Sequence, residues 1–178
     1  MAKVDIRDVA QSDCDVIAEN MRLPDIEECL ALGFTPIDAL QASVISSIST
    51  RTATLDGYPV AVFGISVDED SRVGSPWMLG TSAFDRHGMK LIKFSRDWVN
   101  GMIGLFDALE NYVHAENTHS IRYLKLIGFT VEEPVPYGIN DKPFCRFFME
   151  NKRCAYQSPQ SGWRLPRQRW RHPRWRQA

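Results

Sequence analysis

The sequence predicts one layered α/β domain over residues 1–150, followed by a basic tail over residues 151–178. Two observations predict the domain. Segments with the two-residue period of strands alternate with segments of helical period, and 44% of the 178 residues are hydrophobic, which suffices for one core. A third observation separates the tail: it holds three prolines and closely spaced arginines. Prolines prevent a long helix, so we expect the tail to be extended or disordered.

The first third of the chain predicts one strand and then helices. Residues 4–6 alternate between apolar and charged side chains and predict a short strand. Ser12 or Asp13 is placed to cap a first helix. A second helix is expected over residues 25–32, after a proline and before a glycine. A third helical run, residues 36–42, leads into a serine-rich, β-branched stretch.

The middle of the chain predicts three strands in sequence. Residues 51–55 and 58–67 have strand character, and the dipeptide Asp56-Gly57 between them is typical of a tight hairpin turn. Residues 76–84 predict a further strand. Three consecutive acidic residues before it indicate an exposed loop.

The last part of the domain predicts two more helices and three more strands. We expect a helix over residues 88–106, although glycines weaken its end. Asn117 can cap a shorter helix that stops at Gly128. The remaining strands are expected over residues 109–115, 130–135 and 144–149.

Charge is distributed unevenly along the chain. Residues 1–151 hold 13 Lys and Arg against 22 Asp and Glu, which gives −9, whereas residues 152–178 hold eight Lys and Arg and no acid, which gives +8. An acidic body gives no reason to expect nucleic-acid binding. The tail differs, because six arginines and three tryptophans between residues 163 and 176 suit phosphates, stacked bases or a bilayer interface. An appended extension with no binding role, or neutralisation of the acidic body, fits the same composition.

Several classes of protein are not expected. The sequence has no run of about 18 apolar residues, so we expect no membrane span. It has no apolar segment after its first lysine, so we expect no secretory signal peptide. Four cysteines occur without a CxxC pair, which suits a reducing compartment. We expect no metal site, because His114 and His119 lack the spacing of helical metal ligands.

The segment from Leu109 to Phe129 carries a family resemblance. Asn117 and Ser120, followed by an amphipathic helix and Gly128-Phe129, resemble the C-terminal signature of the GNAT superfamily of N-acetyltransferases. The run from Leu109 to Phe129 is similar to the internal virion protein A family of short-tailed bacteriophages, whose members are GNAT-like. The resemblance implies a mixed, mostly antiparallel central sheet flanked by helices. It also implies acetyl-CoA as a cofactor, phage or host proteins as partners, and the host cytoplasm or the virion as location.

The resemblance also implies a phosphate-binding loop between the fourth strand and the next helix. The family pattern is Arg or Gln, two residues, Gly, one residue, then Gly or Ala. The candidate cofactor-binding residues of this segment are Arg86, His87, Gly88, Met89 and Lys90. Asn117, which can cap the later helix, is the sixth candidate. Only one glycine is present and Asp85 adds a negative charge, so an ordinary strand-to-helix turn with solvated bases is the competing interpretation. For Asn117 the competing interpretation is a plain helix cap.

The resemblance further implies a tyrosine that protonates the departing CoA thiolate. Leu124 holds the matching position, and Tyr123, the candidate catalytic residue, lies about 100° away around the helix. Core packing is the competing interpretation of Tyr123. The nearest candidates for the family's acidic base are the loop residues Asp68, Glu69 and Asp70.

Three functions follow from these observations. The first is a phage accessory or virion-associated protein that acts through protein contacts on a degenerate acetyltransferase scaffold. The second is an acetyl-CoA-dependent N-acetyltransferase with an atypical phosphate loop. The third is a protein that binds nucleic acid or membrane through residues 152–178.

Overall fold

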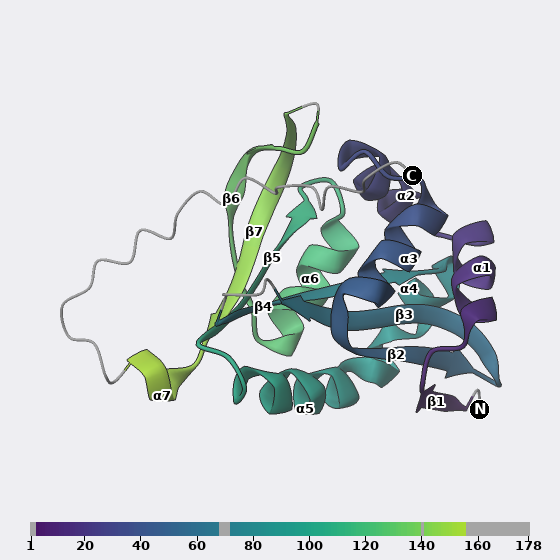
Figure 1. Cartoon of the computed structure of the whole chain (residues 1–178), viewed down its shortest axis with the longest axis horizontal. Coiled ribbons are helices and arrows are strands. Elements are labelled where there is room, and N and C mark those ends of the chain that lie inside the picture. Colours follow the sequence, from purple (N-terminus) through teal and green to yellow (C-terminus); the bar gives the residue numbers. More distant parts are fainter. Residues whose placement is uncertain (1–2, 68–71, 140, 156–178) are drawn as a thin grey trace, which may run out of the picture.

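A seven-stranded sheet with strand order β1-β2-β3-β4-β5-β7-β6 forms the centre of the molecule (Figure 1). The computed structural model describes residues 3–67, 72–139 and 141–155. Every neighbouring pair of strands is antiparallel except β4 and β5, which run parallel. The strands are β1 (Val4–Arg7), β2 (Ser47–Leu55), β3 (Tyr58–Val67), β4 (Val73–Gly80), β5 (Ala108–His114), β6 (Thr130–Tyr137) and β7 (Lys142–Glu150). The predicted mixed, mostly antiparallel α/β fold is confirmed.

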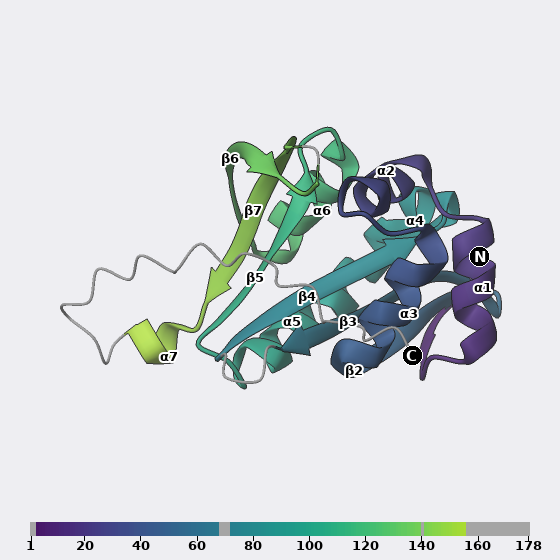
Figure 2. The same cartoon turned by 45° about the horizontal axis from the view of Figure 1, so that its top comes forward.

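Helices cover both faces of the sheet (Figure 1, Figure 2). One face carries α1 (Gln11–Glu19), α2 (Leu23–Ala31) and α3 (Pro36–Ser46). The other carries α4 (Ser82–His87), the 3-10 turn η1 (Gly88–Leu91), α5 (Ile92–Ile103) and α6 (Thr118–Ile127). Each layer buries its own apolar cluster, centred on Ile17 and Leu40 under α1 to α3, and on Phe84, Leu109 and Phe147 under α4 to α6. Burial of these two clusters supplies the main driving force for folding.

The sheet opens between its two parallel strands. β4 and β5 pair only at Val73–Ala108 and Gly74–Leu109, and then diverge. The paired end is tight: a Cβ on Gly74 would lie 2.6 Å from Ile65 and 3.0 Å from Leu109. A larger residue at Gly74 would therefore force the neighbouring side chains to shift.

Local turn and cap signals are confirmed where they act over a few residues. Asp56 and Gly57 have φ angles of 51° and 86°, as a tight hairpin turn needs. The Asn117 side chain accepts the Ser120 N–H at 3.2 Å and caps α6. Gly128, with φ 111°, ends that helix.

Several predicted element ends are wrong by up to four residues. α3 continues to Ser46 and β2 begins directly after it at Ser47, earlier than the predicted start at residue 51. α1 begins at Gln11, and Asp13 accepts the Ala10 N–H at 2.8 Å from inside the helix instead of preceding it. The helix expected over residues 88–106 is divided into η1 and α5, and it ends at Ile103.

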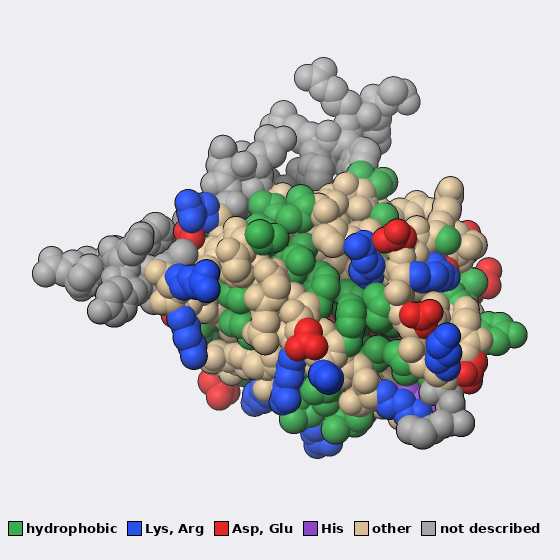
Figure 3. Space-filling model, turned by 90° about the horizontal axis from the view of Figure 1, so that it is seen from below, with side chains coloured by type: hydrophobic (Ala, Val, Ile, Leu, Met, Phe, Trp, Pro, Cys, Tyr) green, Lys and Arg blue, Asp and Glu red, His purple; other side chains and the backbone are tan. Residues whose placement is uncertain are grey.

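The chain beyond the sheet is described only as far as the short helix α7 (Lys152–Ala155). The remainder of the basic tail, residues 156–178, lies outside the described residues. Among the described helices, none alone is long and apolar enough to cross a membrane, and α2 with α3 meets that test only as a pair bent by 74°. The face seen from the α5 side shows Lys and Arg interspersed with acidic and hydrophobic side chains (Figure 3).

Candidate functional site

The candidate site is the crevice between the carboxyl ends of β4 and β5. In open α/β sheets, ligands bind outside the carboxyl ends of strands where neighbouring strands part. Here that place lies between Gly80, the last residue of β4, and His114, the last residue of β5. Helix α2 lies next to this end of the two strands (Figure 2).

The backbone groups that face the crevice are bonded to α2 and the residue that precedes it. Thr81 donates its N–H to Val60 of β3 at 2.9 Å, so the polar groups of Gly80 point the other way, toward β5. The Gly80 C=O accepts the Arg22 N–H at 3.0 Å, and the Gly80 N–H donates to Asp25 at 2.9 Å. Both crevice-facing groups of Gly80 are therefore satisfied within the chain.

The end of β5 is held in the same way. Ala115 donates its N–H to Pro143 on the β7 side at 2.8 Å, which leaves the N–H of His114 facing β4. That N–H donates to the carboxyl group of Glu28, one turn along α2 from Asp25. One helix thus bonds to the facing edges of both diverging strands.

A buried arginine fixes the start of α2 in this position. The Arg22 guanidinium donates to Asp25 at 2.8 Å, to Asp85 of α4, and to the Ser120 hydroxyl of α6 at 2.7 Å. Only 4% of Arg22 is exposed, and its guanidinium lies 5.8 Å from the centre of the Phe84 ring. Because a buried charge is tolerated only when it is paired and hydrogen-bonded, these partners are structural requirements.

Asn117 joins the same set of side chains. Besides capping α6, its amide donates to Asp25 at 3.3 Å and to Glu28 at 3.5 Å. We call the connected set the Arg22 cluster. Its members are Arg22, Asp25, Glu28, Asp85, Asn117 and Ser120. The cluster ties α2 to α4 and α6 across the crevice, which makes it the most highly connected polar group of this region.

The carboxyl groups of the cluster titrate abnormally. Burial, followed by the nearby charge of Asp25, raises the pKa of Glu28 to about 8. A pKa of about 8 favours the protonated form of Glu28 near neutral pH. Burial also raises the pKa of Asp25 above its ordinary value, although the charge of Arg22 opposes that shift. The adjacent Arg22 cation favours the ionised form of Asp25, against the effect of burial.

A single side chain bridges the narrower part of the crevice. The Asn111 amide N–H₂ donates to the C=O of Pro76 on β4 at 3.0 Å, and its carbonyl accepts the N–H of Tyr112 on β5 at 2.8 Å. Pro76 has no N–H to satisfy, so a proline is tolerated here in a central strand. Asn111 replaces the backbone ladder where the strands have moved too far apart to bond directly.

The predicted phosphate loop is not a loop. β4 ends at Gly80 and α4 begins at Ser82, so the prediction of a strand as far as Phe84 is wrong. The reason is a helix cap: the Thr81 hydroxyl accepts the Ala83 N–H at 3.3 Å. The residues expected to line a strand-to-helix turn already belong to α4 and η1.

The predicted cofactor residues from that segment do not come together. Arg86, Met89 and Lys90 are exposed and His87 is half-buried. Gly88 is buried, and a Cβ there would lie 3.4 Å from Phe84 and 3.7 Å from Tyr123, so Gly88 packs against aromatic rings. A role of these five residues and of Asn117 in binding acetyl-CoA stays a prediction. Asp68, Glu69 and Asp70 lie outside the described residues.

Tyr123 packs in the core beneath α4 and α5. Its ring meets that of Phe84 edge to face at 5.3 Å, and its hydroxyl bonds to the Ser95 hydroxyl at 2.7 Å. Burial raises its pKa, although the bond to Ser95 opposes that shift. The core-packing interpretation is confirmed, while a catalytic role stays a prediction.

At the crevice, polar groups that could meet the pyrophosphate of acetyl-CoA are bonded within the chain. A phosphate needs unused backbone N–H groups and cations at a helix N-terminus. Here the Gly80 N–H is bonded to Asp25, the Ala83 N–H to Thr81, and the one cation, Arg22, is paired with two carboxylates. An incoming phosphate would meet the negative charges of Asp25 and Asp85.

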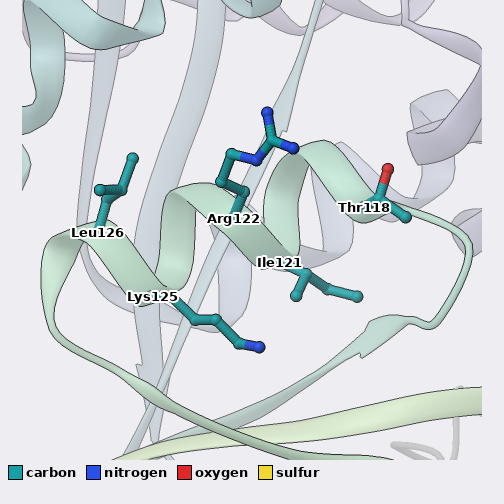
Figure 4. A pocket seen from close by; sticks show the side chains of 5 residues that line it. All are labelled: Thr118, Ile121, Arg122, Lys125 and Leu126. Atoms are coloured by element: carbon teal, nitrogen blue, oxygen red, sulfur yellow. The ribbon is translucent and has the colours of Figure 1, made fainter.

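Two surface hollows lie elsewhere on the molecule, and neither is lined by the Arg22 cluster. One, of about 410 Å³, lies on the outer face of α6, where Arg122 and Lys125 point away from each other (Figure 4). The other, also about 410 Å³, lies between α1 and α3 beside Asp15 and Glu19. Among the described residues, no group of three His, Cys, Asp or Glu side chains is arranged to hold a metal ion.

Sequence reasoning missed four members of the Arg22 cluster, namely Arg22, Asp25, Glu28 and Asp85. One signal for them is present: Arg22 is the only Lys or Arg between residues 8 and 50, a stretch that holds eight acidic residues. A lone base among acids on apolar helices indicates a buried ion pair. Its partners in α4 and α6 lie 63 and 98 residues away, which no local pattern reveals.

Comparison with solved structures identifies the fold. The structure matches a GNAT-family acetyltransferase from Bacillus anthracis with a TM-score of 0.62, over 84% of this chain and 96% of that one, at 13% identity. It matches the aminoglycoside acetyltransferase AAC(6′)-Ib, solved with ribostamycin and coenzyme A, with a TM-score of 0.60 over 90% and 99%, at 17% identity. At such identities these matches show a GNAT fold and nothing more.

Comparison of sequences identifies a relative. No protein-family model matches the chain. The chain is 36% identical over 111 residues to a protein of Escherichia phage T7 described as "Probable scaffold protein gp13", and the match covers 61% of this chain and 73% of the phage protein. At that identity and coverage, this GNAT-fold chain belongs to the family of the phage T7 probable scaffold protein.

Proposed function

We propose that this chain is a bacteriophage accessory protein, of scaffold or internal-virion type, that acts through protein contacts and not through acetyl-CoA. The observation that carries the proposal is the Arg22 cluster. It occupies the crevice in which a GNAT fold would hold a cofactor, and it leaves the Gly80 N–H no free bond. A protein that keeps the scaffold without its cofactor site is left with its surfaces as the means of action.

The relative supports the same class of function. The phage T7 protein is described as a probable scaffold protein, and scaffolds work by contacts with other proteins. The resemblance of residues 109–129 to the internal virion protein A family points the same way. Phage or host proteins are then the partners, and the host cytoplasm or the virion is the place of action.

Titration calorimetry of the full chain tests the cofactor part of the proposal. Acetyl-CoA and ATP are compared at low and high salt, because the basic tail attracts both anions without selectivity. We expect equal, weak heats for the two ligands, lost at high salt. Saturable binding of acetyl-CoA that ATP does not match would overturn the proposal. It would favour the second function, an N-acetyltransferase with an atypical phosphate loop.

A tagged copy in infected cells tests the protein-contact part. We expect the chain to sediment with assembling or finished phage particles and to co-purify with structural proteins of the phage. A chain that stays free of particles and of phage proteins throughout infection would contradict a scaffold or virion role.

The tail supports a second, separate activity. Six arginines and three tryptophans between residues 163 and 176 suit nucleic acid or an anionic membrane. Binding of duplex DNA and of anionic vesicles is measured with the full chain and with residues 152–178 deleted. We expect salt-dependent binding that the deletion abolishes. Binding that survives the deletion would refute this activity.

A further inference from the structure

The structure assigns the crevice between β4 and β5 a ligand from within the chain: the two side-chain carboxyl groups of α2. Asp25 and Glu28 accept the N–H groups of Gly80 and His114, one from each diverging strand. The inference rests on the proposed function in one respect only, that the crevice is closed to acetyl-CoA. It goes further by naming what closes the crevice and which chemical group the crevice binds.

The closure has three levels from the narrow to the wide end of the crevice. At the first, β4 and β5 pair directly at Gly74 and Leu109. At the second, the Asn111 side chain spans the gap. At the third, where the strands are furthest apart, the two carboxyl groups of α2 take the place of the missing strand partner.

The main chain before α2 completes the third level. Met21 forms an antiparallel bridge with Thr81, and the Arg22 N–H donates to the Gly80 C=O. The edge of β4 that lost β5 as a partner has therefore gained residues 21 and 22 in its place. Unpaired strand edges are open to other chains, so this contact also protects the edge.

The position of α2 is fixed by charge as well as by hydrogen bonds. Arg22 lies between Asp25 of α2 and Asp85 of α4, and it reaches Ser120 of α6. Arg22 directly precedes α2 and moves with it, so moving α2 out of the crevice separates Arg22 from Asp85 of α4 and removes the Asp25 carboxyl group from Gly80. The crevice thus binds carboxyl groups, and those of α2 occupy it.

Amide hydrogen exchange of the full chain, followed by NMR, tests this inference residue by residue. In the wild-type chain we expect the Gly80 and His114 amides to be as protected as their neighbours Thr81 and Ala115, which bond to β3 and to β7. Asp25→Ala is expected to speed exchange at Gly80 by about tenfold or more, with Thr81 unchanged. Glu28→Ala is expected to do the same at His114, with Ala115 unchanged.

Glu27→Ala is the matched control, because Glu27 is an exposed carboxylate on the same helix. It should leave all four amides as in the wild type. Should Asp25→Ala fail to fold, the Glu28 variants carry the test alone: Glu28→Gln keeps an acceptor oxygen and should keep His114 protected, whereas Glu28→Ala should not. Fast exchange at Gly80 and His114 in the wild type, or no site-specific change in the Ala variants, would overturn the inference.

The outcome is distinguishable from failure of the proposed function. Saturable acetyl-CoA binding by the wild-type chain refutes the proposed function, whatever the exchange pattern. Loss of the exchange pattern with no acetyl-CoA binding refutes the internal ligand and leaves the proposed function in place.

Discussion

Asp25 accepts two hydrogen bonds at one carboxylate oxygen: from the backbone N–H of Gly80 at 2.9 Å and from Arg22 at 2.8 Å. The first bond joins α2 to the end of β4, across 55 residues of sequence. The second places the Arg22 cation beside this fully buried carboxyl group and favours its ionised form. Stability and closure of the crevice therefore depend on the same side chain.

Removal of Arg22 is expected to destabilise the fold strongly. Arg22→Met preserves much of the side-chain length but leaves Asp25 buried without its cation. Breaking a buried ion pair in this way lowers the free energy of unfolding by about 3–5 kcal/mol. The measurement is urea denaturation near neutral pH, followed by circular dichroism.

Two further variants show whether this loss comes from the uncompensated charge. Arg122→Met removes an exposed arginine of α6 and should change the free energy of unfolding by about 0.5 kcal/mol or less. The double variant Arg22→Met with Asp25→Asn removes both charges and should recover part of the stability. A loss below about 1 kcal/mol for Arg22→Met alone would contradict the assignment.

Glu28 makes stability depend on pH in a direction unusual for a carboxyl group. Its pKa is about 8 in the folded chain against an ordinary 4.5, so the folded state holds a proton that the unfolded state releases in between. The stabilisation that comes from holding this proton is fully present below the pKa of Glu28 in the unfolded chain. It is lost as pH rises toward the pKa of Glu28 in the folded chain. The free energy of unfolding should fall by up to about 1.4 kcal/mol per pH unit in that window.

Glu28→Gln removes the titration while keeping the shape of the protonated side chain. Urea denaturation between about pH 5 and about pH 8 should give a flatter profile for this variant, which becomes more stable than the wild type at the upper end. Glu27→Gln, on the exposed side of the same helix, should retain the wild-type slope. Parallel profiles for Glu28→Gln and the wild type would show that Glu28 is ionised in the folded chain.

The elements that the sequence predicted well are those fixed by neighbouring residues. The turn at Asp56 and Gly57, the cap at Asn117 and the stop at Gly128 each depend on conformations within a few residues. The fold class follows from the order of such elements, and the resemblance at residues 109–129 added the architecture.

The elements predicted wrongly are those where a short or apolar segment fits two structures. Residues 76–84 are apolar enough for one long strand, but the Thr81 cap starts a six-residue helix too short to show a helical period. The phosphate-loop prediction inherited that error and placed Arg86 and Gly88 in a loop. Gly88 instead lies in η1 and packs against the ring of Phe84.

The Arg22 cluster could not be found from local pattern because its partners are distant in sequence. Arg22 and Ser120 are 98 residues apart, and only the fold brings α2, α4 and α6 together. The predicted cap at Asn117 is confirmed, but its second bond to Asp25 depends on that same assembly. The only sequence signal for a site built from such long-range contacts is local composition, here a lone arginine among acidic residues.

Asn111 is expected to contribute to stability as a bridge between strands. Asn111→Ala leaves the Pro76 C=O and the Tyr112 N–H without the partner that each now has. Loss of partners for two such groups should lower the free energy of unfolding by about 1–3 kcal/mol. Urea denaturation measures the loss, and Asn100→Ala, on the exposed face of α5, serves as the control. Equal stability of the two variants would show that water replaces the bridge at no cost.

Tyr123 gives a last prediction, which separates packing from chemistry. Its hydroxyl bonds to Ser95 at 2.7 Å, and its ring contacts Phe84. Tyr123→Phe keeps the ring and loses the bond, so the free energy of unfolding should fall by about 0.5–1.5 kcal/mol. Ser95→Ala should have a similar effect, and the double variant should be little worse than either single one, because all three remove the same bond. Urea denaturation of the four proteins gives the coupling energy directly. Additive losses would show that the two hydroxyls contribute to stability independently and would contradict this prediction.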